Sequence, residues 1–143
     1  MNETPTLPEL AARLLTQEVG EIQEAEALAS TVVAVLATFL SNVSSLVGVL
    51  GSTGLFRRSV RQTQAVFPLY AEVLHDEQNG MLNAVGASLR TQTPDVAREA
   101  SIALLTAYFH LLGSFIGERL TRQLILEAWP ELLAPLSGEE TQV

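Results

Sequence analysis

The sequence predicts an all-α fold: a compact bundle of about five helices, with a long central helix and a long C-terminal helix. Apolar residues recur at intervals of three and four along nearly every segment, which is the spacing of one helix face. No segment sustains the alternation of apolar and polar residues typical of a strand. Hydrophobic residues make up 48% of the 143 residues, enough for one core. We therefore expect a single helical domain over residues 1–130, followed by an acidic, flexible tail over residues 131–143.

The first helix is expected to begin after Thr6 and to end near Gly20. Thr6 and Glu9 have the spacing of a capping box, in which each side chain accepts a hydrogen bond from the other residue's backbone amide. Gly20 follows the last apolar residue of the pattern, where glycine commonly ends a helix. The apolar face between these limits should belong to the core, and it consists of Leu7, Leu10, Ala11, Leu14, Leu15 and Val19.

The central helix is expected to start near Glu21 and to continue through an uncharged stretch over residues 28–56. Gly48, Gly51 and Gly54 predict an end or a kink, because each glycine inside a helix costs about 1 kcal/mol relative to alanine. The face expected to pack in the core carries Leu28, Val32, Val35, Phe39, Val43, Leu46 and Leu50.

A third helix is expected from Leu55 to the residue before Pro68, since the residue preceding a proline avoids helical dihedral angles. Residues 71–92 are the least regular part of the chain. Within them, residues 76–80 have the composition of a turn, and residues 81–90 fit a short helix. The side chains of this short helix that should face the core are Leu82, Val85 and Leu89.

The C-terminal helix has a clear start. Thr93 is a favourable cap, and Pro94 occupies the first helical position, where a proline loses no hydrogen bond. Gly113 and Ser114 predict a kink or a split, and Pro130 ends the helix. Its apolar stripe comprises Val96, Ile102, Leu105, Phe109, Leu112, Ile116, Leu120, Leu124, Ile125 and Trp129.

The absence of Cys and Lys and the negative net charge exclude several classes of function. The chain has no Cys and no Lys, which rules out disulfides, thiol catalysis, cysteine zinc sites and lysine chemistry. Its net charge is −8, whereas nucleic-acid binding needs a cationic surface. The start, Met1 to Pro8, lacks the basic and apolar regions of a signal peptide. We expect no nucleic-acid partner and a cytoplasmic location.

Two uncharged runs, residues 28–50 and 100–117, raise the alternative of a membrane-inserted helical hairpin. A membrane span needs about 20 apolar residues, and arginines between the runs would match the positive-inside rule. Against this alternative, Asn42 lies near the middle of the first run, and the second run is short and contains His110. We therefore favour two buried helices of a soluble protein.

Small and polar residues share a second face of the central helix: Thr31, Ala34, Thr38, Ser41, Ser45, Gly48 and Ser52. Small residues let another helix approach closely, and Gly113 and Gly117 would do the same on the C-terminal helix. The favoured interpretation is packing of these two helices within the chain, and the alternative is a homodimer interface. The candidate self-association residues are Thr38, Ser41, Ser45, Gly48, Gly113 and Gly117.

Few side chains suggest catalysis or metal binding. Glu72 and His75 have the Glu-x-x-His spacing of di-metal bundles, but Ala107 stands where a second glutamate would precede His110. We interpret the first pair as a surface cluster and His110 as a hydrogen-bonded core residue. Neither a Gly-x-Ser-x-Gly motif nor a dinucleotide fingerprint is present. We expect no enzyme, no metal and no cofactor, with a ligand- or metal-binding bundle as a further alternative.

The remaining charges gather in two patches. The acidic patch consists of Glu18, Glu21, Glu24 and Glu26, and we interpret it as a solvated face. The basic cluster consists of Arg57, Arg58 and Arg61. These arginines would pair with nearby glutamates or would bind an acidic partner, a phosphate or a membrane surface. They are the candidate partner-binding residues.

Two blocks of the sequence resemble a family of small uncharacterised all-helical bacterial proteins. The block over residues 104–132 contains Phe-Ile-Gly-Glu-x-Leu-Thr and ends with Ala-Trp-Pro-Glu-Leu, and the other block covers residues 46–70. The resemblance implies a soluble bacterial protein that works beside larger partners, such as NTPases or signalling enzymes. It supplies no catalytic residues.

Together these features predict a non-enzymatic helical protein–protein interaction module. It would be an adaptor or regulatory subunit that binds protein partners and forms a homo-oligomer. The prediction depends on the missing catalytic motifs, the small-residue helix faces and the separation of the acidic and basic patches.

Overall fold

The protein is described by a computed structural model over residues 5–20, 24–75 and 80–133, and these ranges contain helices and no strands. The predicted all-α bundle is confirmed. Its α-helices are α1 (Leu7–Val19), α2 (Ala25–Val47), α3 (Val49–Gln64), α4 (Met81–Arg90), α5 (Pro94–Ile116) and α6 (Glu118–Ala128). Two short 3-10 helices, η1 (Pro68–Glu72) and η2 (Pro130–Leu133), complete the fold.

The predicted acidic tail is only partly covered by this description. Glu131 and Leu132 belong to η2, and the Leu132 side chain is buried in the core. The folded part of the chain therefore extends past residue 130, where the tail was expected to begin. The rest of the expected tail, residues 134–143, lies outside the described residues.

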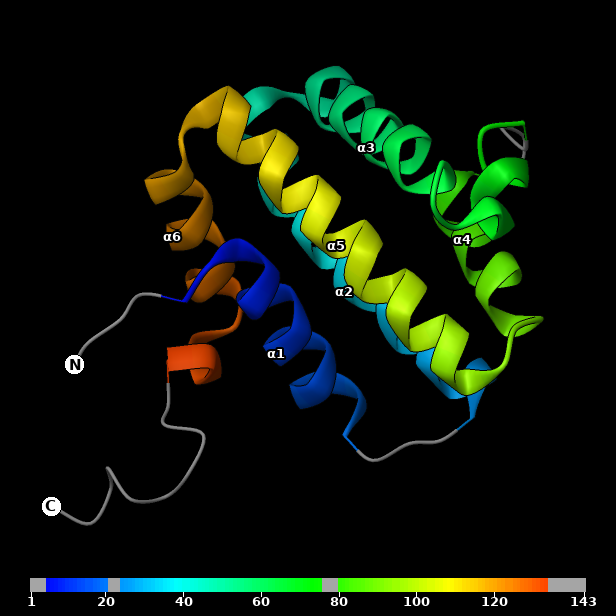
Figure 1. The fold of residues 1–143 in the computed structure, drawn as a ribbon. Coiled ribbons are helices and arrows are strands. Elements are labelled where there is room, and N and C mark those ends of the chain that lie inside the picture. Colours follow the sequence, from blue (N-terminus) through cyan, green and yellow to red (C-terminus); the bar gives the residue numbers. More distant parts are fainter. Residues whose placement is uncertain (1–4, 21–23, 76–79, 134–143) are drawn as a thin grey trace, which may run out of the picture.

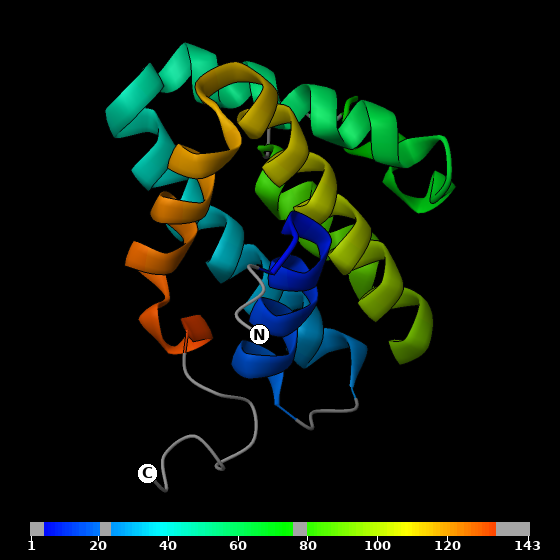
Figure 2. The ribbon, with the colours of Figure 1, turned by 60° about the vertical axis from the view of Figure 1, so that its left-hand side comes forward.

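Helices α2 and α5, of 23 residues each, form the centre of the bundle. They lie side by side and run in the same direction, so both end at the same end of the molecule (Figures 1 and 2). Helix α3 turns back from the end of α2 and packs on α5, and α4 packs on α2. Helices α1 and α6 cover the other side of the central pair (Figure 1).

An aromatic cluster joins α2 and α5 at mid-length. The Phe39 ring lies edge-on to Tyr108 and Phe109, with ring centroids 5.6 and 5.2 Å apart, and Trp129 lies 6.1 Å away. Phe39, Tyr108 and Phe109 are fully buried. Edge-to-face aromatic pairs add about 0.5–1.5 kcal/mol each beyond the burial of their surface. This cluster therefore fixes α2 against α5 and α6.

Local signals place the helix starts where the sequence predicts them. The Thr6 amide donates to the Glu9 Oε1 at 3.0 Å, and the Glu9 amide donates to the Thr6 Oγ1 at 3.2 Å. At the start of α5, the Thr93 Oγ1 accepts from the Val96 amide at 3.3 Å. A cap of this kind contributes about 1 kcal/mol. Both predicted caps are confirmed.

The helix ends differ from the prediction. Of the three glycines near residue 50, only Gly48 breaks the helix, whereas Gly51 and Gly54 lie inside α3. The expected long C-terminal helix is divided at Gly117 instead of at Gly113 and Ser114, because the α5 hydrogen bonds continue to Ile116. Both breaks lie at the end of the bundle where α2 and α5 terminate (Figures 1 and 2).

Candidate interaction surface

The two helix breaks have the same backbone geometry. Gly48 has φ 89° and ψ 158°, and Gly117 has φ 100° and ψ 144°. The Gly48 amide donates to the Ser44 carbonyl at 2.8 Å, and the Gly48 carbonyl accepts from the Ser52 amide at 3.0 Å. Gly117 makes the same pair of bonds, at 2.9 and 3.1 Å. One glycine with positive φ thus turns the chain sharply while hydrogen bonding continues into both helices.

The side chains beside these breaks form an exposed apolar cluster, which we call the apex. It consists of Leu46 (49% exposed), Val49 (69%), Leu50 (88%) and Phe115 (64%). These residues come from the ends of α2 and α5 and the start of α3, and the two corners are adjacent in both views (Figures 1 and 2). Leu46 and Leu50 were expected in the core, and that expectation is wrong, because the break at Gly48 ends the buried stripe at Val43.

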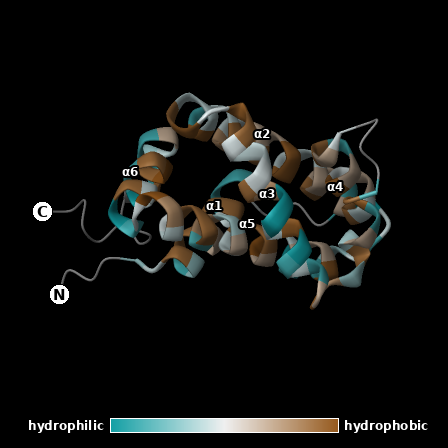
Figure 3. Ribbon diagram, turned by 90° about the horizontal axis from the view of Figure 1, so that it is seen from above, coloured by the Kyte–Doolittle hydropathy of each residue, from teal (hydrophilic) through white to brown (hydrophobic). Residues whose placement is uncertain are grey.

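The three predicted partner-binding arginines lie on α3. Its buried face carries Leu55, Phe56 and Val60 among others, so Leu50, Arg57 and Arg61, at intervals of seven and four, share the outward side. Arg58 and Arg61 are exposed, and Arg57 is half-buried. The hydrophilic middle of α3 is visible from above (Figure 3). We call Arg57, Arg58 and Arg61 the basic face of α3.

The carboxylates at the starts of the central helix pair lie away from the basic face of α3. No Asp or Glu occurs between Glu26 and Glu72, and this stretch contains the whole basic face of α3. The exposed carboxylates at the starts of α2 and α5 are Glu24, Glu26, Asp95 and Glu99, at the end opposite the apex. Glu18 of the predicted acidic patch is also exposed, whereas Glu21 lies outside the described residues. The parallel run of α2 and α5 therefore gathers negative charge away from the apex.

Near the apex, the one carboxylate at the start of α6 has a cationic partner. Glu118 accepts a hydrogen bond from the Arg122 guanidinium at 2.8 Å, one helical turn further along. Arg122 also donates to the Pro5 carbonyl at 3.1 Å, which ties α6 to the start of the chain. Arg119, between them, is exposed.

The predicted self-association residues separate into different environments. Thr38, Ser41 and Ser45 are exposed on one side of α2. Helix α5 packs on the other side of α2, where Phe39 is. The expectation that small faces join the two long helices is therefore wrong, because large aromatic residues fill the contact instead. Self-association through this side of α2 stays a prediction.

The glycines of that set also differ from one another. A methyl group at Gly113 would lie 3.7 Å from the Leu7 Cδ1 and 3.8 Å from the Thr121 Oγ1, so Gly113 serves packing against α1 and α6 within the chain. Gly48 and Gly117 are exposed at the helix breaks. Their role in the fold is to turn the chain, and they bring the apex side chains to the surface.

A crevice between α3 and α5 adjoins the basic face. Its volume is about 350 Å³, and it is lined by Gln62, Thr63, Val66, Phe67, Ala103, Thr106 and Ala107. Arg58 lies one helical turn before Gln62, at the edge of this crevice. The crevice is mostly apolar, with cations on one side, which is a suitable surface for an apolar segment that also carries carboxylates.

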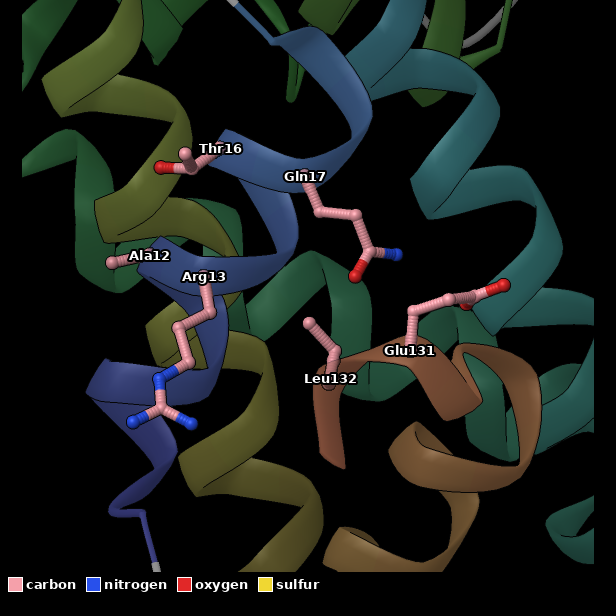
Figure 4. A pocket seen from close by; sticks show the side chains of 6 residues that line it. All are labelled: Ala12, Arg13, Thr16, Gln17, Glu131 and Leu132. Carbon is pink, nitrogen blue, oxygen red and sulfur yellow. The ribbon is translucent and has the colours of Figure 1, made fainter. Parts of the chain in front are cut away.

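A second cavity, of about 270 Å³, lies between α1 and η2 (Figure 4). Its lining residues are Ala12, Arg13, Thr16, Gln17, Glu131 and Leu132. The Arg13 guanidinium and the Thr16 hydroxyl point away from Glu131, whose carboxylate points away from Leu132 (Figure 4). A small-molecule site needs polar groups that converge on the ligand. Of the polar groups, only the Gln17 amide points toward Leu132 and Glu131, whereas those of Arg13, Thr16 and Glu131 point in different directions (Figure 4), so they do not converge on one ligand.

The histidines do not assemble a metal site in the part of the chain that the structure describes. Glu72 ends the 3-10 helix η1, and both Glu72 and His75 are exposed. His110 is exposed too, which corrects the expectation of a core histidine. Within the described ranges, no group of three His, Asp or Glu side chains is close enough to hold a metal ion.

The hydroxyl groups of the core have structural partners. The Ser52 Oγ donates to the Leu40 carbonyl and lies 3.2 Å from the Tyr108 hydroxyl, and the Tyr70 hydroxyl donates to the Ala100 carbonyl at 2.7 Å. Burial raises the pKa of Tyr108 to about 12. Burial also raises the pKa of Tyr70. Both phenols are therefore neutral at physiological pH, and neither is placed to act on a substrate.

Two helices have the dimensions of a membrane span. Helices α2 and α5 are long and apolar enough by length and composition, and 39% of the most apolar stretch of each is buried inside the bundle. A buried core helix of a soluble protein meets the same criterion. Length and composition therefore do not distinguish a membrane span from a buried core helix. The relative direction of α2 and α5 is a further criterion.

No protein family model, curated protein or solved structure matches this chain. The resemblance of residues 46–70 and 104–132 to small helical bacterial proteins stays a prediction. The interaction surface is thus defined by the geometry of this fold: a basic face and a crevice on α3, and an apolar apex where α2 and α5 end.

Proposed function

We propose that the protein is a non-enzymatic interaction module that binds an acidic protein partner through the basic face of α3. The observation that carries the proposal is the basic face of α3, whose Arg58 lies one helical turn before Gln62 at the edge of an apolar crevice, in a stretch of chain without carboxylates. Arginine binds carboxylates bidentately, and the crevice offers apolar surface next to these charges. A partner segment with both carboxylates and apolar side chains would use both features.

The described polar groups support a binding role over catalysis. The core hydroxyls of Ser52, Tyr70 and Tyr108 are buried and hydrogen-bonded, and the polar groups of the α1–η2 cavity do not converge on one point. An active site needs a nucleophile or general base that a substrate can reach. The module is proposed to act as an adaptor or regulatory subunit in the cytoplasm.

The direction of the long helices favours a bundle that folds in water. Two spans joined in a hairpin run in opposite directions across the bilayer, whereas α2 and α5 run in the same direction (Figures 1 and 2). Two parallel spans would require the chain between them, including Arg57, Arg58 and Arg61, to cross back through the bilayer. Each arginine at the bilayer centre costs about 2.5–3.5 kcal/mol or more.

The experiment for this proposal is charge reversal on α3. Partners recovered with the native protein are purified, and their affinities are measured by titration calorimetry for wild type and for Arg58→Glu/Arg61→Glu. We expect affinity to fall about tenfold or more, because attraction to carboxylates becomes repulsion. Arg90→Glu is the matched control, since Arg90 is exposed on α4, away from this face. Equal affinities of the double variant and wild type for every purified partner would refute the proposal.

We also propose that the module self-associates through the exposed side of α2 that carries Thr38, Ser41 and Ser45. Small side chains there would let a helix of a second copy approach closely. Sedimentation equilibrium of wild type and Ser41→Arg tests this component. We expect the arginine to shift the protein toward the monomer. Identical sedimentation as a monomer by both proteins would remove self-association from the proposal.

A further inference from the structure

The apex is an apolar surface that the fold leaves uncovered by any described residue. Its four side chains, Leu46, Val49, Leu50 and Phe115, are between 49% and 88% exposed. They come from two corners where the chain turns at a single glycine, and both corners lie at the same end of the bundle (Figures 1 and 2). Clustered apolar side chains of this kind mark a contact with a protein or a membrane.

The small size of the apex favours a bilayer as its partner. A stable protein–protein interface buries about 800 Å² on each partner and involves about 20–30 residues a side. The apex has four apolar residues. A bilayer needs no complementary groove, because its headgroups and chains rearrange around a projecting cluster that is inserted into the interface.

The charges near the apex match an anionic surface. Arg57 and Arg58 follow Leu50 by about two helical turns, roughly 10 Å along α3, and Arg119 is exposed at the start of α6. Glu118 is paired with Arg122. Anionic headgroups attract arginines that lie near the membrane surface. Arginine also binds phosphate groups bidentately.

The charge separation along α2 and α5 would orient the molecule on such a surface. Glu24, Glu26, Asp95 and Glu99 lie at the starts of these helices, away from the apex. The chain as a whole has a net charge of −8, so an anionic bilayer repels most of its surface. An approach with the apex foremost brings Arg57, Arg58 and Arg119 to the lipid together with the apex side chains, and it keeps these carboxylates distant.

We infer that the apex attaches the folded protein to an anionic membrane surface, by inserting Leu50, Val49 and Phe115 among the headgroups while nearby arginines bind lipid phosphates. The bundle stays intact, and neither α2 nor α5 crosses the bilayer. This function goes beyond the proposed protein binding: Leu50 lies on the outward side of α3 near the basic face, but neither Leu50 nor Phe115 lines the crevice.

Vesicle co-sedimentation tests the inference. Full-length protein is mixed with vesicles of phosphatidylcholine alone and with vesicles that contain equal parts of phosphatidylglycerol and phosphatidylcholine. We expect binding to the anionic vesicles, weaker binding as salt is raised, and release by high salt without detergent. Leu50→Ser/Phe115→Ser should lower the partition coefficient at least tenfold, because each removed side chain loses its transfer from water.

A matched control distinguishes the apex from any exposed apolar residue. Val96 is 37% exposed at the start of α5, the end opposite the apex, so Val96→Ser should bind anionic vesicles like wild type. Circular dichroism confirms that each variant is folded. Absence of binding to anionic vesicles, equal binding to neutral vesicles, or unchanged binding of the apex variant would each overturn the inference.

Two further outcomes would assign the apex differently. If wild type is a dimer, the apex variant is a monomer and neither protein binds vesicles, the apex is a contact between two copies of this chain. If wild type resists extraction by salt and alkaline carbonate, a helix spans the bilayer. Both outcomes overturn the inference. The affinity of the apex variant for purified protein partners is also measured. If this affinity equals that of wild type while vesicle binding is lost, the two proposals concern different surfaces and are tested separately.

Discussion

The middle of the α2–α5 pair and the apex are built from the same two helices but have opposite environments. At mid-length, Phe39, Tyr108 and Phe109 are completely buried and contact one another edge to face. At the end of the pair, Leu50 is 88% exposed and Phe115 is 64% exposed. Residues of similar hydrophobicity thus stabilise the fold in one region and remain available for binding in the other. What separates the two regions is a single glycine after each helix, at which the chain leaves its axis.

Truncation of a buried aromatic ring between α2 and α5 should reduce stability more than any other change considered. Phe39→Ala removes a ring that contacts Tyr108, Phe109 and Trp129, and it should lower the free energy of unfolding by about 3–5 kcal/mol. Leu50→Ala at the apex should change it by less than about 0.5 kcal/mol, because an exposed side chain loses little on truncation. Urea denaturation of both variants measures the difference. Similar losses in both variants would mean that the apex is covered in the native protein.

The second prediction concerns the stability of the core at alkaline pH. Burial raises the pKa of Tyr108 to about 12 from its ordinary value of 10, so the unfolded chain loses this proton first as pH rises. The contribution of Tyr108 to stability should be complete below pH 10 and should fall by about 3 kcal/mol as pH rises through 12. The chain has no Lys and no Cys, so its two tyrosines are the side chains that titrate in this range.

Thermal unfolding at pH 8 to 12 checks this alkaline loss. Burial raises the pKa of Tyr70 in the same direction, so Tyr108→Phe should reduce the loss without abolishing it. Leu50→Ala should lose stability with pH as wild type does, because no ionisable group is altered. A wild-type curve that stays flat to pH 12 would show that the Tyr108 hydroxyl is open to solvent.

The smallest effect concerns the corners that separate the two regions. Gly48→Ala and Gly117→Ala should each destabilise the fold by about 1–3 kcal/mol, because a side chain is strained at positive φ. Gly54 is the matched control: it lies inside α3 with helical geometry and open space around it. Gly54→Ala should stabilise the protein by about 0.5–1 kcal/mol. Chemical denaturation would contradict this account if all three alanines had the same sign.

The basic face of α3 could be predicted from the sequence, whereas the apex could not. Arg57, Arg58 and Arg61 could be singled out from the sequence, because a basic cluster without nearby carboxylates is visible there. The apex could not, since Leu46 and Leu50 continue the apolar stripe of α2 at helical spacing. A glycine at position 48 indicates a possible helix break, but Gly51 and Gly54 indicate a break equally well. Only one of the three breaks the helix.

The helical fold class and the starts of α1 and α5 follow from local sequence patterns alone. These features depend on residues three or four apart, such as Thr6 with Glu9 and Thr93 with Val96, which contact each other in any helix that begins there. Local patterns do not predict that α2 and α5 run in the same direction, that aromatic residues join them, or that the chain turns at Gly48 and Gly117 (Figure 1). These outcomes depend on packing between segments far apart in the chain, where several arrangements satisfy the same local pattern.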